Sequence, residues 1–215
     1  VRAALDELTL EEHGVDGSAI LLYGEGWDFG EVQGGKLFEQ ATQGNLDGTG
    51  IATFSDRLRD AVHGGSPVDG GSKFTQGYGT GLATAPNSRE NRSEAAQFAD
   101  LAHQTDLVRL GLAGNLRDYT FVTSNGQLSR GAELDYRGAP AGYASHPEEV
   151  ISYVDAHDNE TLFDLAVFKL DENTSIEDRA RMNTLMLATA TLSQTPSFWH
   201  AGTELLRSKS LDRNS

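Results

Sequence analysis

The sequence of 215 residues contains no cysteine. Disulfide bonds, cysteine-ligated zinc or iron–sulfur sites and a thiol nucleophile are therefore excluded from this chain. It also has no apolar run near the roughly 18 residues that a membrane-spanning helix needs. Basic residues are few, because 17 lysines and arginines stand against 32 aspartates and glutamates, for a formal net charge of −15. A surface this acidic repels phosphate backbones and anionic lipid heads, so we expect neither a nucleic-acid nor a membrane partner.

The start of the chain lacks both an initiator methionine and the apolar core of a signal peptide. Residues 1–10 instead have the apolar spacing of a helix, with Val1, Ala4, Leu5 and Leu8 on one stripe. The chain therefore begins in the middle of an expected structural element. We expect it to be a fragment of a longer protein.

Short apolar runs alternate with helical patterns along the rest of the chain. Runs that are continuous rather than alternating are typical of strands buried in a parallel sheet. One helix is marked at both ends, by the N-cap residue Ser55 and by the pair Gly64 and Gly65. The patterns together predict strands at 19–23, 51–54, 150–154 and 197–200, and helices at 56–62, 93–112 (in one or two pieces) and 175–192. This alternation indicates an α/β architecture with parallel strands.

Long polar stretches separate these elements. Residues 30–50, 64–92 and 114–147 read as loops, the last with one short apolar piece at 119–122. The glycine-rich stretch 64–92 has few large apolar residues, which predicts an excursion from the fold rather than part of its core. In the last helix, one apolar face is expected from the spacing of Met182, Leu185, Met186, Thr189 and Leu192.

Acidic residues follow two of the predicted strands. Glu25 comes directly after one apolar run, and Asp158 lies four residues beyond Val154 at the end of another. In parallel α/β folds, functional groups gather where strands end. Trp27 lies two residues from Glu25, and an apolar neighbour of this kind disfavours the charged form of a carboxyl group. Acids at these positions also occur as helix caps, salt-bridge partners or solvated loop residues.

The segments around these acids resemble a known family. Residues 23–32, YGEGWDFGEV, resemble the stretch around the general acid of pullulanases and limit dextrinases, the α-1,6-debranching members of the α-amylase family (glycoside hydrolase family 13). Residues 153–159, YVDAHDN, resemble a later motif that the wider family shares. Two further stretches, 49–60 (TGIATFSDRLRD) and 202–210 (GTELLRSKS), are similar to pullulanase segments in the same order.

The resemblance implies a fold and a set of roles. The chain is expected to be the C-terminal half of a (β/α)8 TIM barrel, strands five to eight, with long loop excursions, and residues 1–215 form one partial catalytic domain. Glu25 is implied as the general acid/base and Asp158 as the carboxylate that stabilises the transition state of glycoside cleavage. Substrate contacts are implied for Trp27, Phe29, His157 and Asn159. The implied partner is an α-glucan such as pullulan, amylopectin or a limit dextrin.

One member of the family's catalytic set is missing from the chain. The family's nucleophile is an aspartate in an earlier motif of the type Phe-Arg-Phe-Asp, and neither this word nor the still earlier Asn-His motif occurs here. We therefore expect the isolated chain to be inactive. Two alternatives stay open: another α-amylase-family hydrolase, α-1,4-acting or glycogen-debranching, or a catalytically silent glucan-binding protein.

Cofactor signals are weak. Residues 77–81, GYGTG, superficially resemble a dinucleotide loop, but no strand precedes them and no helix pattern follows. The histidines His63, His103, His146 and His200 lack metal-ligand spacing and are expected at the surface or in packing roles. Calcium occurs in the family, yet no acidic loop here has an EF-hand pattern. We therefore predict no cofactor and no metal site.

Overall fold

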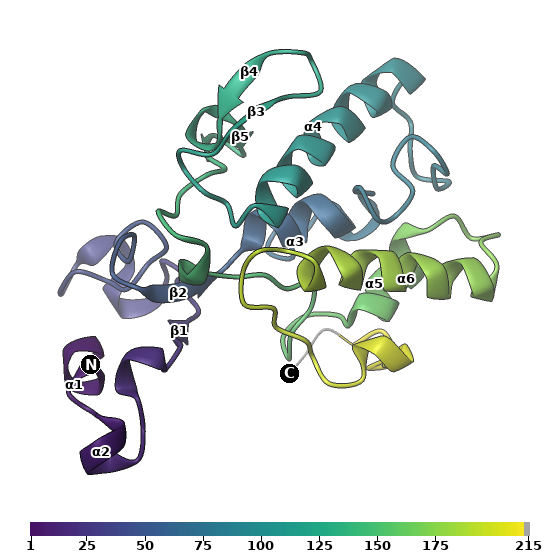
Figure 1. The fold of residues 1–215 in the computed structure, drawn as a ribbon. Coiled ribbons are helices and arrows are strands. Elements are labelled where there is room, and N and C mark those ends of the chain that lie inside the picture. The colour runs from purple at the N-terminus through teal and green to yellow at the C-terminus, as the bar shows by residue number, and fades with distance from the viewer. Residues whose placement is uncertain (213–215) are drawn as a thin grey trace.

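The computed structural model describes residues 1–212 (Figure 1). These residues form helices and short strands in a mixed α/β arrangement. The helices are α1 (Arg2–Asp6), α2 (Leu10–His13), α3 (Asp56–His63), α4 (Glu94–Leu112), α5 (Leu162–Lys169) and α6 (Ile176–Thr191). The strands are β1 (Leu22–Gly24), β2 (Ile51–Phe54), β3 (Thr120–Val122), β4 (Leu128–Arg130), β5 (Asp135–Tyr136), β6 (Ala139–Pro140) and β7 (Val150–Ile151).

A parallel sheet runs through the chain in sequence order. Strand β2 pairs with β1 on one side and with β7 on the other, both in parallel, with Leu22 opposite Ile51 and Thr53 opposite Val150. A parallel bridge between Ser152 and Ser197 adds the fourth predicted segment, which makes one bridge here rather than a strand. The parallel architecture expected from the apolar runs is thus present, in the order 22–24, 51–54, 150–152 and 197.

The middle of this row is more buried than its ends. Ala52 in β2 and Val150 in β7 are fully buried, whereas Tyr23 in β1 is 48 % exposed and Ser197 at the other end is exposed as well. The sequence predicted burial on both faces for all of these strands, and for β1 this is wrong. Within the described residues β1 has a sheet neighbour on one side only, so it is an edge strand.

The helices pack together through one apolar cluster. Its members come from α3, α4, α5 and α6, from β3 and β5, and from the segment after β7, and include Leu58, Leu110, Val154, Leu162 and Met186. Helix α3 begins where predicted, since the Leu58 N–H donates to Ser55 Oγ, and α4 is a single helix capped by Ser93. The contact between α3 and α4 needs a glycine, because a Cβ at Gly111 would lie 2.7 Å from Leu58 Cδ1.

Two helices differ from the prediction. Helix α5 (LFDLAVFK) was not predicted, because its residues are apolar on nearly every side and carry no 3.6-residue period. In α6, Met186 and Thr189 of the expected face are buried, but Leu185 and Leu192 are 47 % and 76 % exposed. Asn183 is buried in their place, and its Nδ2 donates to the Thr203 carbonyl at 3.0 Å.

The glycine-rich stretch 64–92 is not the excursion that the sequence predicted. Its only regular element in the described chain is the short 3-10 helix η3 (Ser72–Phe74), yet Thr80 and Leu82 are buried. The buried ammonium of Lys169, at the end of α5, donates to the carbonyls of Gly64, Ser72 and Thr75 at 2.7, 2.8 and 2.8 Å. These hydrogen bonds join the stretch to α5, and the N–H groups of Tyr78 and Gly79 join it to α3 by donating to the carbonyls of Ala61 and Val62.

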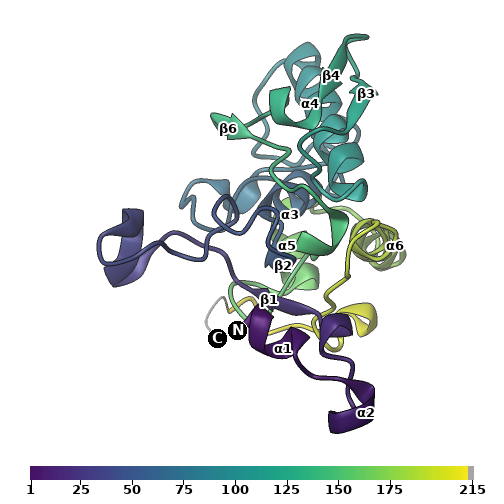
Figure 2. The same ribbon diagram turned by 60° about the vertical axis from the view of Figure 1, so that its left-hand side comes forward.

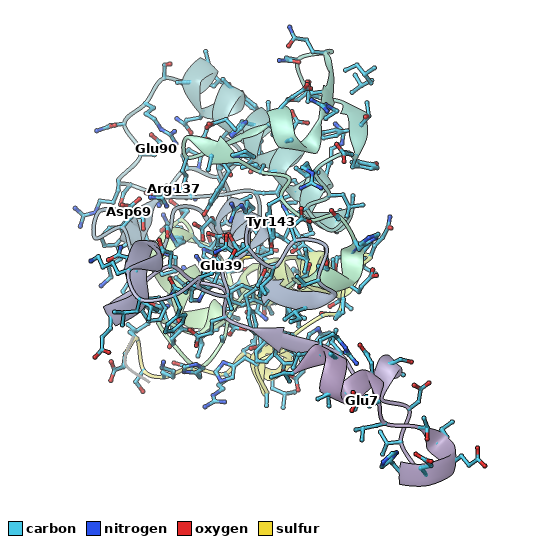
Figure 3. All side chains as sticks on the ribbon, turned by 90° about the vertical axis from the view of Figure 1, so that its left-hand side faces the viewer. Glu7, Glu39, Asp69, Glu90, Arg137 and Tyr143 are labelled. Atoms are coloured by element: carbon cyan, nitrogen blue, oxygen red, sulfur yellow. The ribbon has the colours of Figure 1, made fainter. Side chains whose placement is uncertain are left out.

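The stretch 114–147 forms two antiparallel hairpins, β3–β4 and β5–β6, near α4 (Figure 1). The second hairpin is joined to α3 by the Arg57 guanidinium, which lies 4.9 Å from the Tyr136 ring and 4.6 Å from the Tyr143 ring. It is also joined to the 64–92 stretch, because Arg137 Nη2 donates to Asp69 Oδ2 at 2.6 Å (Figure 3).

The first residues lie at the periphery. Helices α1 and α2 extend away from the helical layer in Figure 2, and Figure 3 shows Glu7 on this projecting segment. The helical pattern predicted for 1–10 is present only in part, because α1 ends at Asp6 and α2 begins at Leu10. Along the apolar stripe Val1 is 88 % exposed, whereas Leu5 and Leu8 are partly buried.

Candidate active site

Aromatic side chains meet at the carboxyl ends of the parallel segments. Tyr23, Phe54, Tyr153 and Phe198 each stand at or just beyond one segment's end. The Phe54 ring lies at the centre, 6.0 Å from the ring of Tyr23, 4.9 Å from that of Tyr153 and 5.2 Å from that of Phe198. All three pairs are edge-to-face, the arrangement that aromatic quadrupoles favour. The parallel register thus builds an aromatic floor with one ring from each segment.

A pocket opens on this floor and brings four of the six predicted site residues together. Its lining consists of Glu25, Trp27, Phe54, Tyr153, Ala156, His157, Asp158 and Phe198. Trp27 is partly buried, whereas Glu25, His157 and Asp158 are exposed. The predicted acids therefore share one pocket, although they are 133 positions apart, from 25 to 158, in the sequence. The apolar surroundings expected for Glu25 are represented in the pocket lining by Trp27 and Phe54, although Glu25 itself is exposed.

The other two predicted residues lie outside the pocket lining. Phe29 is 59 % exposed, and its ring is not part of the lining. Asn159 touches the site through its neighbour, because its Nδ2 donates to Asp158 Oδ2 at 3.1 Å. The backbone of Asn159 has a φ of 57°, a left-handed conformation that few non-glycine residues adopt.

Two glutamines that the sequence analysis missed hold the segment around Glu25 and Trp27. The Gln43 N–H donates to the Gly26 carbonyl at 3.2 Å, and its Nε2 donates to the Phe54 carbonyl at 2.8 Å. Gln40 Nε2 donates to the Trp27 carbonyl at 3.2 Å. Gly26 itself admits no side chain, because a Cβ there would lie 2.6 Å from Thr53 Cγ2. Both glutamines come from the loop 30–50. No pattern in the sequence of this loop indicates which of its polar residues would make such contacts.

A buried cation supports the floor from the side of α3. The Arg59 guanidinium lies 5.9 Å from the Trp27 ring and 5.5 Å from the Tyr153 ring, and it donates to Tyr153 Oη. Arg59 Nη2 also pairs with Asp60 Oδ1 at 2.7 Å, and Tyr136 Oη donates to Asp60 Oδ2 at 2.7 Å. Burial raises the pKa of the Asp60 carboxyl, and the Arg59 charge opposes this shift.

A second buried carboxylate fixes the segment that carries His157 and Asp158. Asp155 Oδ2 accepts from the Leu162 N–H at 3.0 Å and from Thr203 Oγ1 at 2.9 Å, while His200 Nδ1 lies 3.7 Å away. Burial raises the pKa of Asp155. His200 thus has a packing position next to this carboxylate, as the sequence predicted for the scattered histidines, and His63 is fully buried.

Neither a metal centre nor a membrane span is found in the described part of the chain. Residues 1–212 contain no group of three or more His, Cys, Asp or Glu side chains placed to hold a metal ion. Among the same residues, no helix combines the length and the apolar composition required to cross a bilayer.

Comparison with known proteins identifies relatives over most of the chain. No protein-family model matches it. The chain is 47 % identical over 215 residues to pullulanase 1 of Arabidopsis thaliana, covering 100 % of this chain and 22 % of that protein. It is 46 % identical over 198 residues to the pullulanase of Klebsiella aerogenes, covering 91 % of this chain and 17 % of that protein.

Solved structures agree with these matches. The pullulanase of Klebsiella pneumoniae complexed with maltotriose superposes with a TM-score of 0.82 at 45 % identity, over 91 % of this chain and 18 % of that one. The pullulanase of Bacillus acidopullulyticus gives a TM-score of 0.63 at 27 % identity, over 100 % of this chain and 20 % of that one. The chain spans about a fifth of the length of these relatives. Over that fifth, in sequence and in fold, the chain is homologous to the pullulanases of Arabidopsis thaliana and Klebsiella.

Proposed function

We propose that this chain is part of the catalytic barrel of a retaining glycoside hydrolase that cleaves α-1,6-glucosidic branch linkages in pullulan, amylopectin and limit dextrins. The observation that carries the proposal is the pocket shared by Glu25, Trp27, His157 and Asp158 at the carboxyl ends of parallel strands. Active sites of (β/α)8 barrels lie at this end of the strands. The maltotriose bound in a structure of the Klebsiella pneumoniae relative supports an α-glucan as the ligand.

In this proposal the parallel row 22–24, 51–54, 150–152 and 197 supplies strands five to eight of the barrel. The order of the segments in the sheet supports this placement, because each pairs with the next in the sequence. The exposed outer side of β1 is then the edge where strand four of the barrel would pair. A strand in that position would carry the nucleophilic aspartate that is absent from this chain.

The chemistry assigns a task to each acid. Glu25 protonates the glycosidic oxygen as the bond breaks and later activates water as a base. Asp158 stabilises the positive charge that develops on the sugar ring, an effect that grows when the substrate excludes water from the pocket. His157 and Asn159 hydrogen-bond sugar hydroxyls, and the rings of Trp27 and Phe29 contact the apolar faces of glucose units.

Replacement of Glu25 tests the proposal in the full-length enzyme. Glu25→Gln keeps the shape of the side chain but removes its transferable proton, so we expect turnover of pullulan to fall by about 10²- to 10⁴-fold. Binding of maltotriose, measured by calorimetry, should change little. Glu11→Gln, an exposed glutamate on α2, is the matched control and should keep full activity.

The same assays separate the alternatives. Release of maltotriose from pullulan indicates α-1,6 cleavage, whereas attack on linear malto-oligosaccharides alone indicates an α-1,4-acting hydrolase. A full-length protein that binds maltotriose but hydrolyses neither substrate would be a glucan-binding protein, and the proposed activity would be refuted. Full pullulan turnover by Glu25→Gln would refute the role of Glu25.

A further inference from the structure

A lysine far along the chain reaches the segment that carries Asp158. Lys209 Nζ donates to the His157 carbonyl at 3.0 Å and to the Asn159 carbonyl at 2.6 Å. These carbonyls belong to the residues on either side of Asp158. Hydrogen bonds with a charged donor are roughly twice as strong as neutral ones. One ammonium group therefore spans the backbone on both sides of this carboxylate.

The backbone of Lys209 is held in turn by a buried carboxylate. Asp164, in the first turn of α5, is fully buried. Its oxygens accept from Ser208 Oγ at 2.6 Å, from the Lys209 N–H at 2.7 Å and from the Leu211 N–H at 3.3 Å. The position of the lysine stem is therefore set by the same helix that follows the Asp158 segment. Asp164, Lys209 and the two carbonyls form a closed connection, which we name the lysine clamp.

Both ends of the lysine clamp contain backbone that needs external support. Asn159 has a φ of 57°, and Ser210 and Leu211 have φ values of 57° and 67°. Left-handed conformations are uncommon at non-glycine residues, asparagine adopting them most readily, and they persist where the surrounding structure holds them. The hydrogen bonds of Lys209 and Asp164 act on these residues or their immediate neighbours.

We propose that Lys209 is a positioning residue for Asp158, which it holds in place through the carbonyls of His157 and Asn159. The inference rests on the proposed function, because it takes Asp158 as the carboxylate of the site. Lysine suits the task, since an ammonium group has three donors and no acceptor, and its targets are acceptors only. Residues 202–210, which resemble a pullulanase segment, therefore have a physical role in this proposal. They contain Lys209, whose ammonium group holds the segment that carries Asp158.

The test uses Lys209→Met and Lys209→Arg in the full-length enzyme. Methionine keeps the unbranched stem without the donors, so kcat on pullulan should fall by about 10- to 100-fold, the effect of a misplacement near 1 Å. KM should change by less than about threefold, because the sugar-contacting side chains remain. Lys209→Arg restores donors and should recover part of the lost kcat. Arg181→Met, which removes a cation whose side chain is 80 % exposed on α6, is the control.

Hydrogen exchange provides a readout independent of catalysis. The amides of residues 156–160 should exchange faster in Lys209→Met than in the parent, and those of α4 should not change. An unchanged kcat in an active parent, or a loss equal to the loss of folded protein, overturns the inference. If the parent has no α-1,6 activity, the proposed function fails by itself. In that case, unchanged exchange at 156–160 in Lys209→Met overturns the lysine clamp as well. Faster exchange there supports a purely structural role for the lysine clamp.

Discussion

The ion pair of Arg59 and Asp60 beneath the aromatic floor makes a quantitative test of the structure possible. Their side chains are only 13 % and 5 % exposed, and Arg59 Nη2 lies 2.7 Å from Asp60 Oδ1. Arg59→Met would leave the Asp60 carboxylate buried with one hydrogen-bond donor, the hydroxyl of Tyr136 at 2.7 Å, and one more distant cation, Arg137 Nη1 at 3.7 Å. Removing one partner of a buried pair costs about 3–5 kcal/mol, because the remaining charge loses its closest compensation.

Hydrogen exchange of the α3 amides measures this cost locally, which suits a large protein whose unfolding need not be two-state. A loss of about 3–5 kcal/mol corresponds to a fall in protection of roughly two to three and a half orders of magnitude. Arg59→Met combined with Asp60→Asn should restore most of the protection, because no unpaired charge remains. Arg92→Met removes a more exposed cation, 39 % exposed, which pairs with Glu90 at 2.6 Å and with Asp100 at 2.8 Å, and it should lower protection in the first turn of α4 by less than about fivefold.

The pH dependence of this destabilisation is the test that could refute the buried pair. Burial raises the pKa of Asp60, so the folded state binds this proton more tightly than the unfolded chain does. Its contribution to stability is present at low pH and is lost as pH rises through the folded pKa. Without Arg59 the pKa rises further, so the destabilisation of Arg59→Met should be smaller near pH 5 than near pH 7. A loss below about 1 kcal/mol, or one that is equal at both pH values, would refute the buried pair as described.

Three further predictions concern the chain and its Glu25 segment. The isolated 215-residue chain should not hydrolyse pullulan in a reducing-sugar assay, because the motif that carries the family's nucleophile is absent from it; measurable hydrolysis would contradict this. It should also lack a sharp, reversible thermal transition by circular dichroism, because β1 has an unpaired edge, and a cooperative transition would count against a half barrel. Gly26→Ala should lower pullulan turnover in the full-length enzyme, because it combines a φ of 76° with a contact of 2.6 Å to Thr53. Gly30→Ala, with a φ of 75° and nothing within 4 Å, separates backbone strain from the steric contact and should do less.

Local signals allowed part of the fold to be predicted. Ser55 and Gly64 marked the ends of α3 because an N-cap side chain and a glycine with a positive φ, here 87°, act within one turn of the chain. The signal failed for α5, whose apolar residues surround the helix, and for the buried face of α6, where Asn183 replaces Leu185. These differences depend on which neighbours cover the helix.

The stretch 64–92 illustrates the same limit. Its glycines and polar residues predict a loop, and it has almost no regular structure. One of its contacts with the helices comes from Lys169, which is separated in sequence by 94 to 105 positions from the carbonyls that it contacts. Composition contains no information about such a distant donor.

The sequence alone determined the family resemblance, the parallel α/β class and the two acids at strand ends, because each depends on residue type and short-range spacing. The tertiary structure decided which residues share a pocket and what holds them there. Gln43 reaches the Phe54 carbonyl, and Lys209 reaches those of His157 and Asn159. These polar contacts join loops whose backbone is irregular, and only the packing of the helices on the parallel sheet brings such loops within hydrogen-bonding distance.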